Sequence, residues 1–171
     1  ALGCRVVLEQ GAGLASGYLD ETYSECGAEL VPVADASAWS QADALLCVQS
    51  PTADALGRLR SGALLVGLLA PYANSELDGA LKRCGLSAMA LELLPRISRA
   101  QSADALSSQA NIAGYKSVLL ASAALDRYFP MLMTAAGTVQ PARVVVLGAG
   151  VAGLQAVATA RRLGAVVYVS D

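Results

Sequence analysis

The sequence predicts an α/β fold in which two units with parallel sheets are joined by a long helix. Two observations carry this prediction. Over residues 1–91, short apolar runs alternate with helical segments and short loops, as in strands joined by crossover helices. Residues 143–171 then show the order strand, glycine turn, helix, strand. The apolar strand segments do not alternate with polar residues, which is typical of parallel sheets buried on both faces.

Turn and capping residues separate the elements expected in the first unit. Thr52 precedes one helical segment, Asp20 opens another, and Asn74 or Ser75 precedes a third. The segment 11–17, GAGLASG, lacks a third glycine in register and is expected to be a loop. Strands are expected at 4–9, 28–33, 44–48, 63–69 and 87–91, and helices at 20–26, 52–59 and 75–83.

A long helix is expected over residues 102–128, and Pro130 ends it. A connector follows at 131–142. We therefore place the first domain at 1–107 and the second at 108–171. The chain starts inside an expected strand and stops after the second strand of a fold that ordinarily has five or six. We expect a fragment in which the first domain lacks its first strand and helix and the second is truncated.

The strongest motif is a glycine turn that follows the β-branched run at 144–147. Gly148, Gly150 and Gly153 have the spacing GxGxxG and open a helical segment at 151–163. The first glycine permits a tight turn, the second lets a pyrophosphate approach the backbone, and the third lets the helix pack closely on the sheet. The free N–H groups of the helix N-terminus would attract the phosphates.

A second β-branched run at 166–169 leads to Asp171. A carboxylate about 20 residues after the glycines can accept hydrogen bonds from the adenosine ribose, and it repels a 2′-phosphate. The pattern predicts a Rossmann-like unit that binds NAD rather than NADP. The alternative is a βαβ unit whose glycines serve packing only.

Composition excludes several functions. The chain is 55% hydrophobic and 15% charged, with mean hydropathy +0.50, but its apolar runs are too short to span a membrane or coincide with the glycine turn. Excess apolar surface would suit a partner interface. The net charge is −2 and no basic cluster occurs, which argues against nucleic acid. Without histidine, and with four dispersed cysteines, the chain offers no ordinary metal site.

A polar segment at 95–109 stands out in this apolar chain. Gln101, Asp104 and Ser107 are spaced by three, which places them on one face if they are helical. The plain interpretation is a helix N-terminus, with Gln101 or Ser102 as the cap and Asp104 in the first turn. The functional interpretation is a platform for a nicotinamide amide and ribose, with Arg96 steering phosphate or ribose.

Three segments carry a family resemblance: PRISRAQSADALSSQANIAGYKSVLLA, YFPMLMTAAGT and PARVVVLGAGVAGLQAVATARRLGA. They resemble the NAD(H)-binding domain I of proton-translocating nicotinamide nucleotide transhydrogenase, and residues 6–30 are similar also to alanine dehydrogenase. The resemblance implies that the RAQxxDxLSSQ segment contacts the nicotinamide. It implies catalytic and cofactor roles for Arg96, Gln101, Asp104 and Ser107, and cofactor binding by Gly148, Gly150, Val151, Gly153 and Asp171.

The resemblance implies that NAD(H) bound to this chain exchanges a hydride directly with NADP(H) on a separate domain III. A membrane domain II would couple this to proton translocation. It further implies a homodimer at the cytoplasmic face of a bacterial inner membrane, or at the matrix side in a mitochondrion. Two alternatives stay open. The first is an alanine dehydrogenase-like enzyme, for which Gln49 is not the expected lysine and no histidine exists. The second is a non-catalytic NAD(H)-binding module.

Overall fold

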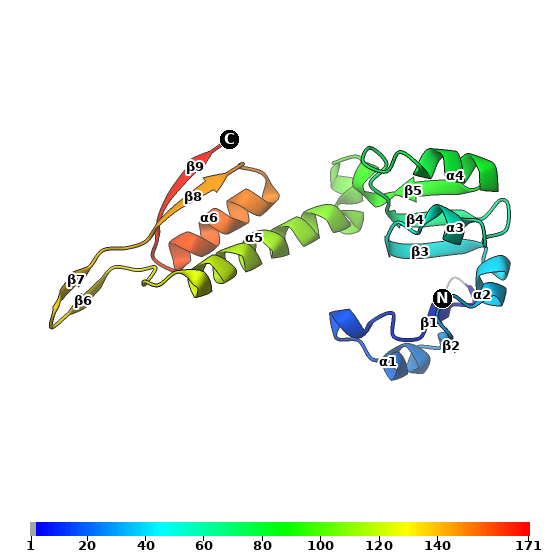
Figure 1. The fold of residues 1–171 in the computed structure, drawn as a ribbon, viewed down its shortest axis with the longest axis horizontal. Coiled ribbons are helices and arrows are strands. Elements are labelled where there is room, and N and C mark those ends of the chain that lie inside the picture. Colours follow the sequence, from blue (N-terminus) through cyan, green and yellow to red (C-terminus); the bar gives the residue numbers. More distant parts are fainter. Residues whose placement is uncertain (1–2) are drawn as a thin grey trace. The chain divides into compact units, whose positions relative to one another are not determined.

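The computed structural model describes residues 3–171, which form two compact units that meet in the sequence at Leu93 and Leu94 (Figure 1). The expected α/β class is confirmed: every expected strand and helix overlaps an observed element. Within residues 3–171, no helix combines the length and apolar character needed to cross a membrane.

The first unit contains parallel strands and short helices. Thr52 caps its helix as expected, because its side chain accepts a hydrogen bond from the N–H of Ala55 at 3.3 Å. The strands are β1 (Val7–Glu9), β2 (Glu29–Val31), β3 (Ala44–Gln49), β4 (Leu64–Leu68) and β5 (Ser87–Ala90), and the α-helices are α1 (Asp20–Glu25), α2 (Ala36–Gln41), α3 (Ala53–Leu56) and α4 (Leu77–Cys84).

These strands pair in two separate parallel ladders rather than in one sheet. One ladder joins β1 to β2, and the other has the order β3-β4-β5 with Leu45 opposite Leu65 and Leu65 opposite Ala88. The strand β2 is short because Pro32 follows it and has no N–H to donate. The connections between successive strands have the crossover length that parallel pairing requires.

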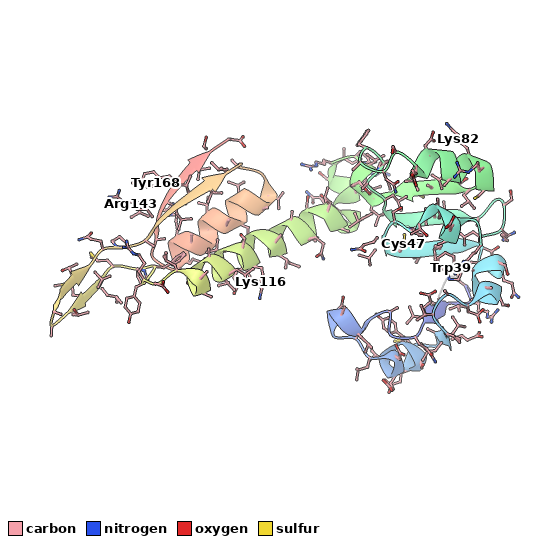
Figure 2. All side chains as sticks on the ribbon, viewed as in Figure 1. Trp39, Cys47, Lys82, Lys116, Arg143 and Tyr168 are labelled. Atoms are coloured by element: carbon pink, nitrogen blue, oxygen red, sulfur yellow. The ribbon has the colours of Figure 1, made fainter. Side chains whose placement is uncertain are left out.

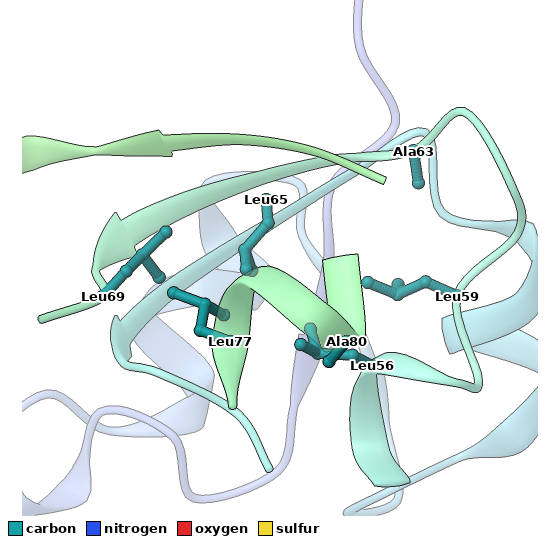
Figure 3. Packing of buried hydrophobic residues seen from close by; sticks show 7 residues of the cluster. All are labelled: Leu56, Leu59, Ala63, Leu65, Leu69, Leu77 and Ala80. Atoms are coloured by element: carbon teal, nitrogen blue, oxygen red, sulfur yellow. The ribbon is translucent and has the colours of Figure 1, made fainter. Parts of the chain in front are cut away.

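The core of the first unit lies where α3 and α4 pack on the β3-β4-β5 sheet (Figure 3). Leu65 is fully buried there, while Leu46 and Val48 of β3 are 76% and 79% exposed. The expectation that both faces are buried is therefore wrong for β3 within the described residues, because both helices contribute to the core on the face that Leu65 occupies. The buried residues are Leu56, Leu59, Ala63, Leu65, Leu69, Leu77 and Ala80.

The short helix α2 was not among the expected elements, because six residues are too few for a clear helical period. Asp35 caps it, since its Oδ1 accepts a hydrogen bond from the N–H of Ala38 at 2.7 Å. The helix carries Trp39, whose ring packs against the core and whose Nε1 donates to Glu9 Oε1 at 2.9 Å. This hydrogen bond ties α2 to the end of β1.

Two other caps differ from expectation. Leu19 rather than Asp20 precedes α1, and the Asp20 carboxylate instead accepts the N–H of Gly11 at 2.9 Å. Glu76 precedes α4 without a side-chain capping bond, in place of Asn74 or Ser75.

In the second unit, α6 contacts both the β8-β9 ladder and the long helix α5 (Figure 1). The ladder is parallel, with Leu147 opposite Ser170. The small core between these elements contains Val118, Phe129, Ala142, Val146, Ala156 and Ala160. The elements are η3 (Ser98–Ala103, a 3₁₀ helix), α5 (Ala105–Ala124), β6 (Leu132–Thr134), β7 (Gly137–Val139), β8 (Arg143–Leu147), α6 (Val151–Arg162) and β9 (Val166–Ser170).

The segment at 131–142, expected only to be a connector, contains an antiparallel hairpin. Met133 of β6 lies opposite Thr138 of β7, and Gly137 has a φ of +125° at the turn. The residues Ala135-Ala136-Gly137 are not one of the strong two-residue hairpin signals, so the turn was not predicted.

The helix α5 is shorter than the expected 102–128. Asp104, not Gln101 or Ser102, is its N-cap, and its Oδ1 accepts the backbone N–H of Ser107 at 2.9 Å. At the other end Leu125 is extended, so the helix stops before Pro130. Hydrogen bonds from the Ser107 hydroxyl and backbone, with a smaller contribution from the Arg96 charge, lower the pKa of Asp104.

Because the folded-state pKa of Asp104 lies below the ordinary value of about 3.9, the charged cap contributes stability that is complete above that value. It is lost as the pH falls from about 4 through the depressed pKa. We expect Asp104→Asn to lower the free energy of unfolding more at pH 6 than at pH 3. Urea unfolding across this range measures the difference. Asp126→Asn is the control, since the exposed Asp126 accepts no hydrogen bond within residues 3–171. A destabilisation by Asp104→Asn that does not vary with pH would contradict this account.

Candidate functional site

The glycine turn joins β8 to α6 through a backbone that only glycine suits at two positions. Gly148 has a φ of +97°, and its N–H donates to the carbonyl oxygen of Ser170 at 2.7 Å. A Cβ at Gly153 would overlap the carbonyl group of Gly148 and come within 3.5 Å of Val146 Cγ1. A Cβ at Gly150 would meet no atom within 4 Å. The turn therefore leaves open space above Gly150 while α6 packs tightly on β8.

The first turn of α6 offers unpaired N–H groups beside this open space. Gly150 is the N-cap and makes no side-chain capping bond, and the first backbone bond of the helix runs from Leu154 N to Gly150 O at 2.9 Å. Among residues 3–171, no acceptor is bonded to the N–H groups of Val151, Ala152 and Gly153. The twelve-residue helix adds the partial positive charge of its N-terminus. These groups can bind an anion such as a diphosphate.

Asp171 lies beside the glycine turn. The parallel pairing of β8 with β9 brings its carboxylate to the loop, where Oδ1 accepts the N–H of Ala149 at 2.8 Å. The side chain is exposed, and a carboxylate has further acceptor sites beyond this one bond. It can therefore accept hydrogen bonds from hydroxyl groups of a ligand bound at the turn.

The polar segment surrounds the start of α5 but is not one continuous α-helix. Gln101 lies in η3, Asp104 follows with a non-helical ψ of 73°, and Ser107 lies in the first turn of α5. The condition for a shared helical face is not met, because Asp104 interrupts the α-helical geometry between Gln101 and Ser107. Asp104 interacts with both Ser107 and Arg96, while the Gln101 side chain is exposed and makes no hydrogen bond within residues 3–171.

The polar segment and the glycine turn belong to the same unit, and α5 connects them. A Cβ at Gly114, in the middle of α5, would overlap the backbone of Ala152 in the first turn of α6. One turn earlier, Asn111 Nδ2 donates to Gln155 Oε1 at 3.2 Å. We did not single out these residues from the sequence. An isolated glycine within a helical pattern costs stability relative to alanine and so often has a packing reason, which was the available signal.

The chain's two lysines lie on helices, as expected (Figure 2). Lys82 on α4 pairs with Asp78 at 2.6 Å, four residues earlier, and Lys116 on α5 is exposed. In the part of the chain from residue 3 onward, no three His, Cys, Asp or Glu side chains gather in a group that could hold a metal ion.

Comparison with known proteins bears on both units. The family model described as alanine dehydrogenase/PNT, N-terminal domain, matches residues 1–113, and the corresponding C-terminal domain model matches residues 117–171. The expected domain boundary at 107/108 differs from both observed ones. It lies after the division of the compact units at 93/94 and before the gap between the two family models at 113–117. The chain is 49% identical to an NAD(P) transhydrogenase subunit alpha polypeptide of Rhodospirillum rubrum, over 99% of this chain and 45% of that protein.

Two solved structures are similar over nearly the whole chain. The structure of transhydrogenase from Sinorhizobium meliloti has a TM-score of 0.89 and 52% identity, and the match covers 99% of this chain and 50% of that one. An L-alanine dehydrogenase structure has a TM-score of 0.80 and 32% identity, with 99% and 46% covered. The chain thus spans about half the length of these relatives. With the two domain models matched in order, the chain belongs to the alanine dehydrogenase/PNT family.

Proposed function

We propose that this chain is the NAD(H)-binding part of a proton-translocating NAD(P) transhydrogenase. Its resemblance to transhydrogenase alpha subunits, at 49% identity, supports the assignment. The observation that carries it is that two features lie in one unit. One is a glycine turn with open space at Gly150 and free N–H groups, and the other is a polar segment rich in hydrogen-bonding side chains. These two groups suit the two ends of a dinucleotide.

The glycine turn would hold the diphosphate and the adenosine ribose. The N–H groups of Val151, Ala152 and Gly153 would donate to the phosphate oxygens, and the open space at Gly150 would admit them. Asp171 would accept hydrogen bonds from the ribose hydroxyls. The charge of Asp171 would also repel a 2′-phosphate, which favours NAD(H) over NADP(H).

The polar segment would orient the nicotinamide. The exposed Gln101 amide can donate to and accept from the carboxamide, and Asp104 can accept from its NH₂ group through the lone pairs that its cap bond leaves free. Ser107 and Arg96 hold the Asp104 carboxylate charged. When bound, the nicotinamide supplies or accepts the hydride, and the protein contributes position and exclusion of water.

This chemistry requires no protein acid or base, which favours it over alanine dehydrogenation. Interconverting an amino acid and a keto acid moves protons as well as a hydride, so it needs a general acid or base. The chain contains no histidine, β3 ends at Gln49, and Lys82 and Lys116 lie on helices. Oxidation of alanine by the full-length protein would overturn the choice.

Catalytic turnover by the proposed transhydrogenase requires partner domains. The proposal includes NADP(H) bound to a separate domain III, a membrane domain II that couples hydride transfer to proton movement, and a homodimer of this chain. It places the chain at the cytoplasmic face of a bacterial inner membrane, or at the matrix side of a mitochondrial one.

We expect Asp171→Ala to raise the Kd for NADH about 10- to 100-fold, because a charged hydrogen bond to the ribose contributes about 1.5–3 kcal/mol. Titration of the protein's effect on NADH fluorescence measures the Kd. Asp126→Ala is the matched control and should leave it unchanged. An unchanged Kd in the Asp171 variant would show that the ribose lies elsewhere.

We expect Gln101→Asn to leave the Kd for NADH within about threefold and to slow hydride transfer to an NADP⁺ analogue about 10- to 100-fold, because a shorter amide misplaces the ring. Stopped-flow absorbance with added domain III measures the rate. Gln140→Asn, the same change at an exposed residue that follows β7 and lies outside the polar segment, should have no effect. Equal rates in the wild type and the Gln101 variant would refute the role of the polar segment.

A further inference from the structure

The helices α5 and α6 come into backbone contact at a single glycine. Gly114 is buried, and a Cβ there would overlap the carbonyl oxygen of Ala152 and lie 2.9 Å from its carbonyl carbon. These neighbours are backbone atoms, so no side chain can move aside to make room. Any larger residue at Gly114 must displace one helix relative to the other.

The contact at Gly114 lies at the anion-binding end of α6. Ala152 is the second residue of that helix, and its N–H is one of the three unpaired groups beside the open space at Gly150. The rest of the helix is held by other contacts, because Val118 of α5 shares a core with Ala156. Because Gly153 also holds the start of α6 against β8, a larger residue at Gly114 would move α5 away from the start of α6 and leave the glycine turn in place.

The polar segment lies at the N-terminal end of α5, the helix that carries Gly114. Asp104 caps α5 ten residues before Gly114, a distance of about 15 Å along a helix. Between Asp104 and Gly114, the Asn111–Gln155 hydrogen bond, at 3.2 Å, links α5 to α6. The Gln155 side chain is itself held, since its Nε2 donates to Thr159 Oγ1 at 3.3 Å.

We propose that Gly114 is a positioning residue: its contact with Ala152 sets the distance between the diphosphate end and the nicotinamide end of the dinucleotide site. This inference rests on the proposed function. Each end can bind its own part of the ligand without the contact. One NADH molecule can bind at the diphosphate end and the nicotinamide end together only when α5 and α6 approach as closely as glycine allows.

The test compares NADH with ADP-ribose, which lacks the nicotinamide, in the full-length protein with its partner subunits. For Gly114→Ala we expect the Kd for ADP-ribose to stay within about twofold and the Kd for NADH to rise about tenfold. The rate of hydride transfer at saturating NADH should fall about 10- to 100-fold. A merely structural role would lower thermal stability and leave the ratio of the two Kd values unchanged.

Two further variants make the outcome decisive. Asn111→Ala removes the link to Gln155 without adding volume, so it should shift the same ratio about two- to threefold even if Gly114→Ala fails to fold. Gly79→Ala on α4 adds a Cβ only 3.2 Å from Nη1 at the flexible end of Arg83, and should change neither Kd. Unchanged ratios in both α5 variants would overturn the inference while leaving the proposed function intact. A wild-type protein that binds no NADH would overturn both.

Discussion

The second unit depends on how closely two helices can pack. Gly114 of α5 meets the backbone of Ala152 at the start of α6, and α6 in turn lies against β8 because Gly153 has no side chain to keep it away from Gly148. Both contacts are of backbone on backbone, so they are short and rigid. They fix the free N–H groups of α6 relative to β8 on one side and to α5 on the other, and the candidate site follows from that placement.

Electrostatics complements this packing. The start of α6 is positive and uncapped by any side chain, whereas Asp171 brings one negative charge to the edge of the same loop. Under the proposed function, a diphosphate would bind to the start of α6, and ribose hydroxyls would donate to Asp171. At the N-terminal end of α5, about 15 Å from Gly114 along the helix, Asp104 keeps its charge through its hydrogen bonds with Ser107. The proposed function assigns Asp171, the start of α6 and the polar segment to the adenosine ribose, the diphosphate and the nicotinamide of NAD(H).

Much of this could be predicted from the sequence, because glycine spacing and β-branched runs act locally. The strands, α6 and the long helix lie where their residues indicated, and the glycine turn has the expected form. The 3₁₀ helix before Asp104, the short helix α2 and the β6–β7 hairpin were not predicted, since each depends on a few residues with weak propensities. Gly114 could not be assigned a role, because its reason for being glycine lies in a residue 38 positions away in the chain.

The central claim is that one unit binds both ends of NADH, through the polar segment and the glycine turn. Hydrogen–deuterium exchange of the full-length protein tests it directly, by comparing backbone exchange with NADH and with ADP-ribose. The account predicts that NADH slows exchange both at 96–107 and at 148–154, and that ADP-ribose slows it only at 148–154. Slower exchange at 148–154 alone with NADH, or equal effects of the two ligands at 96–107, would contradict it.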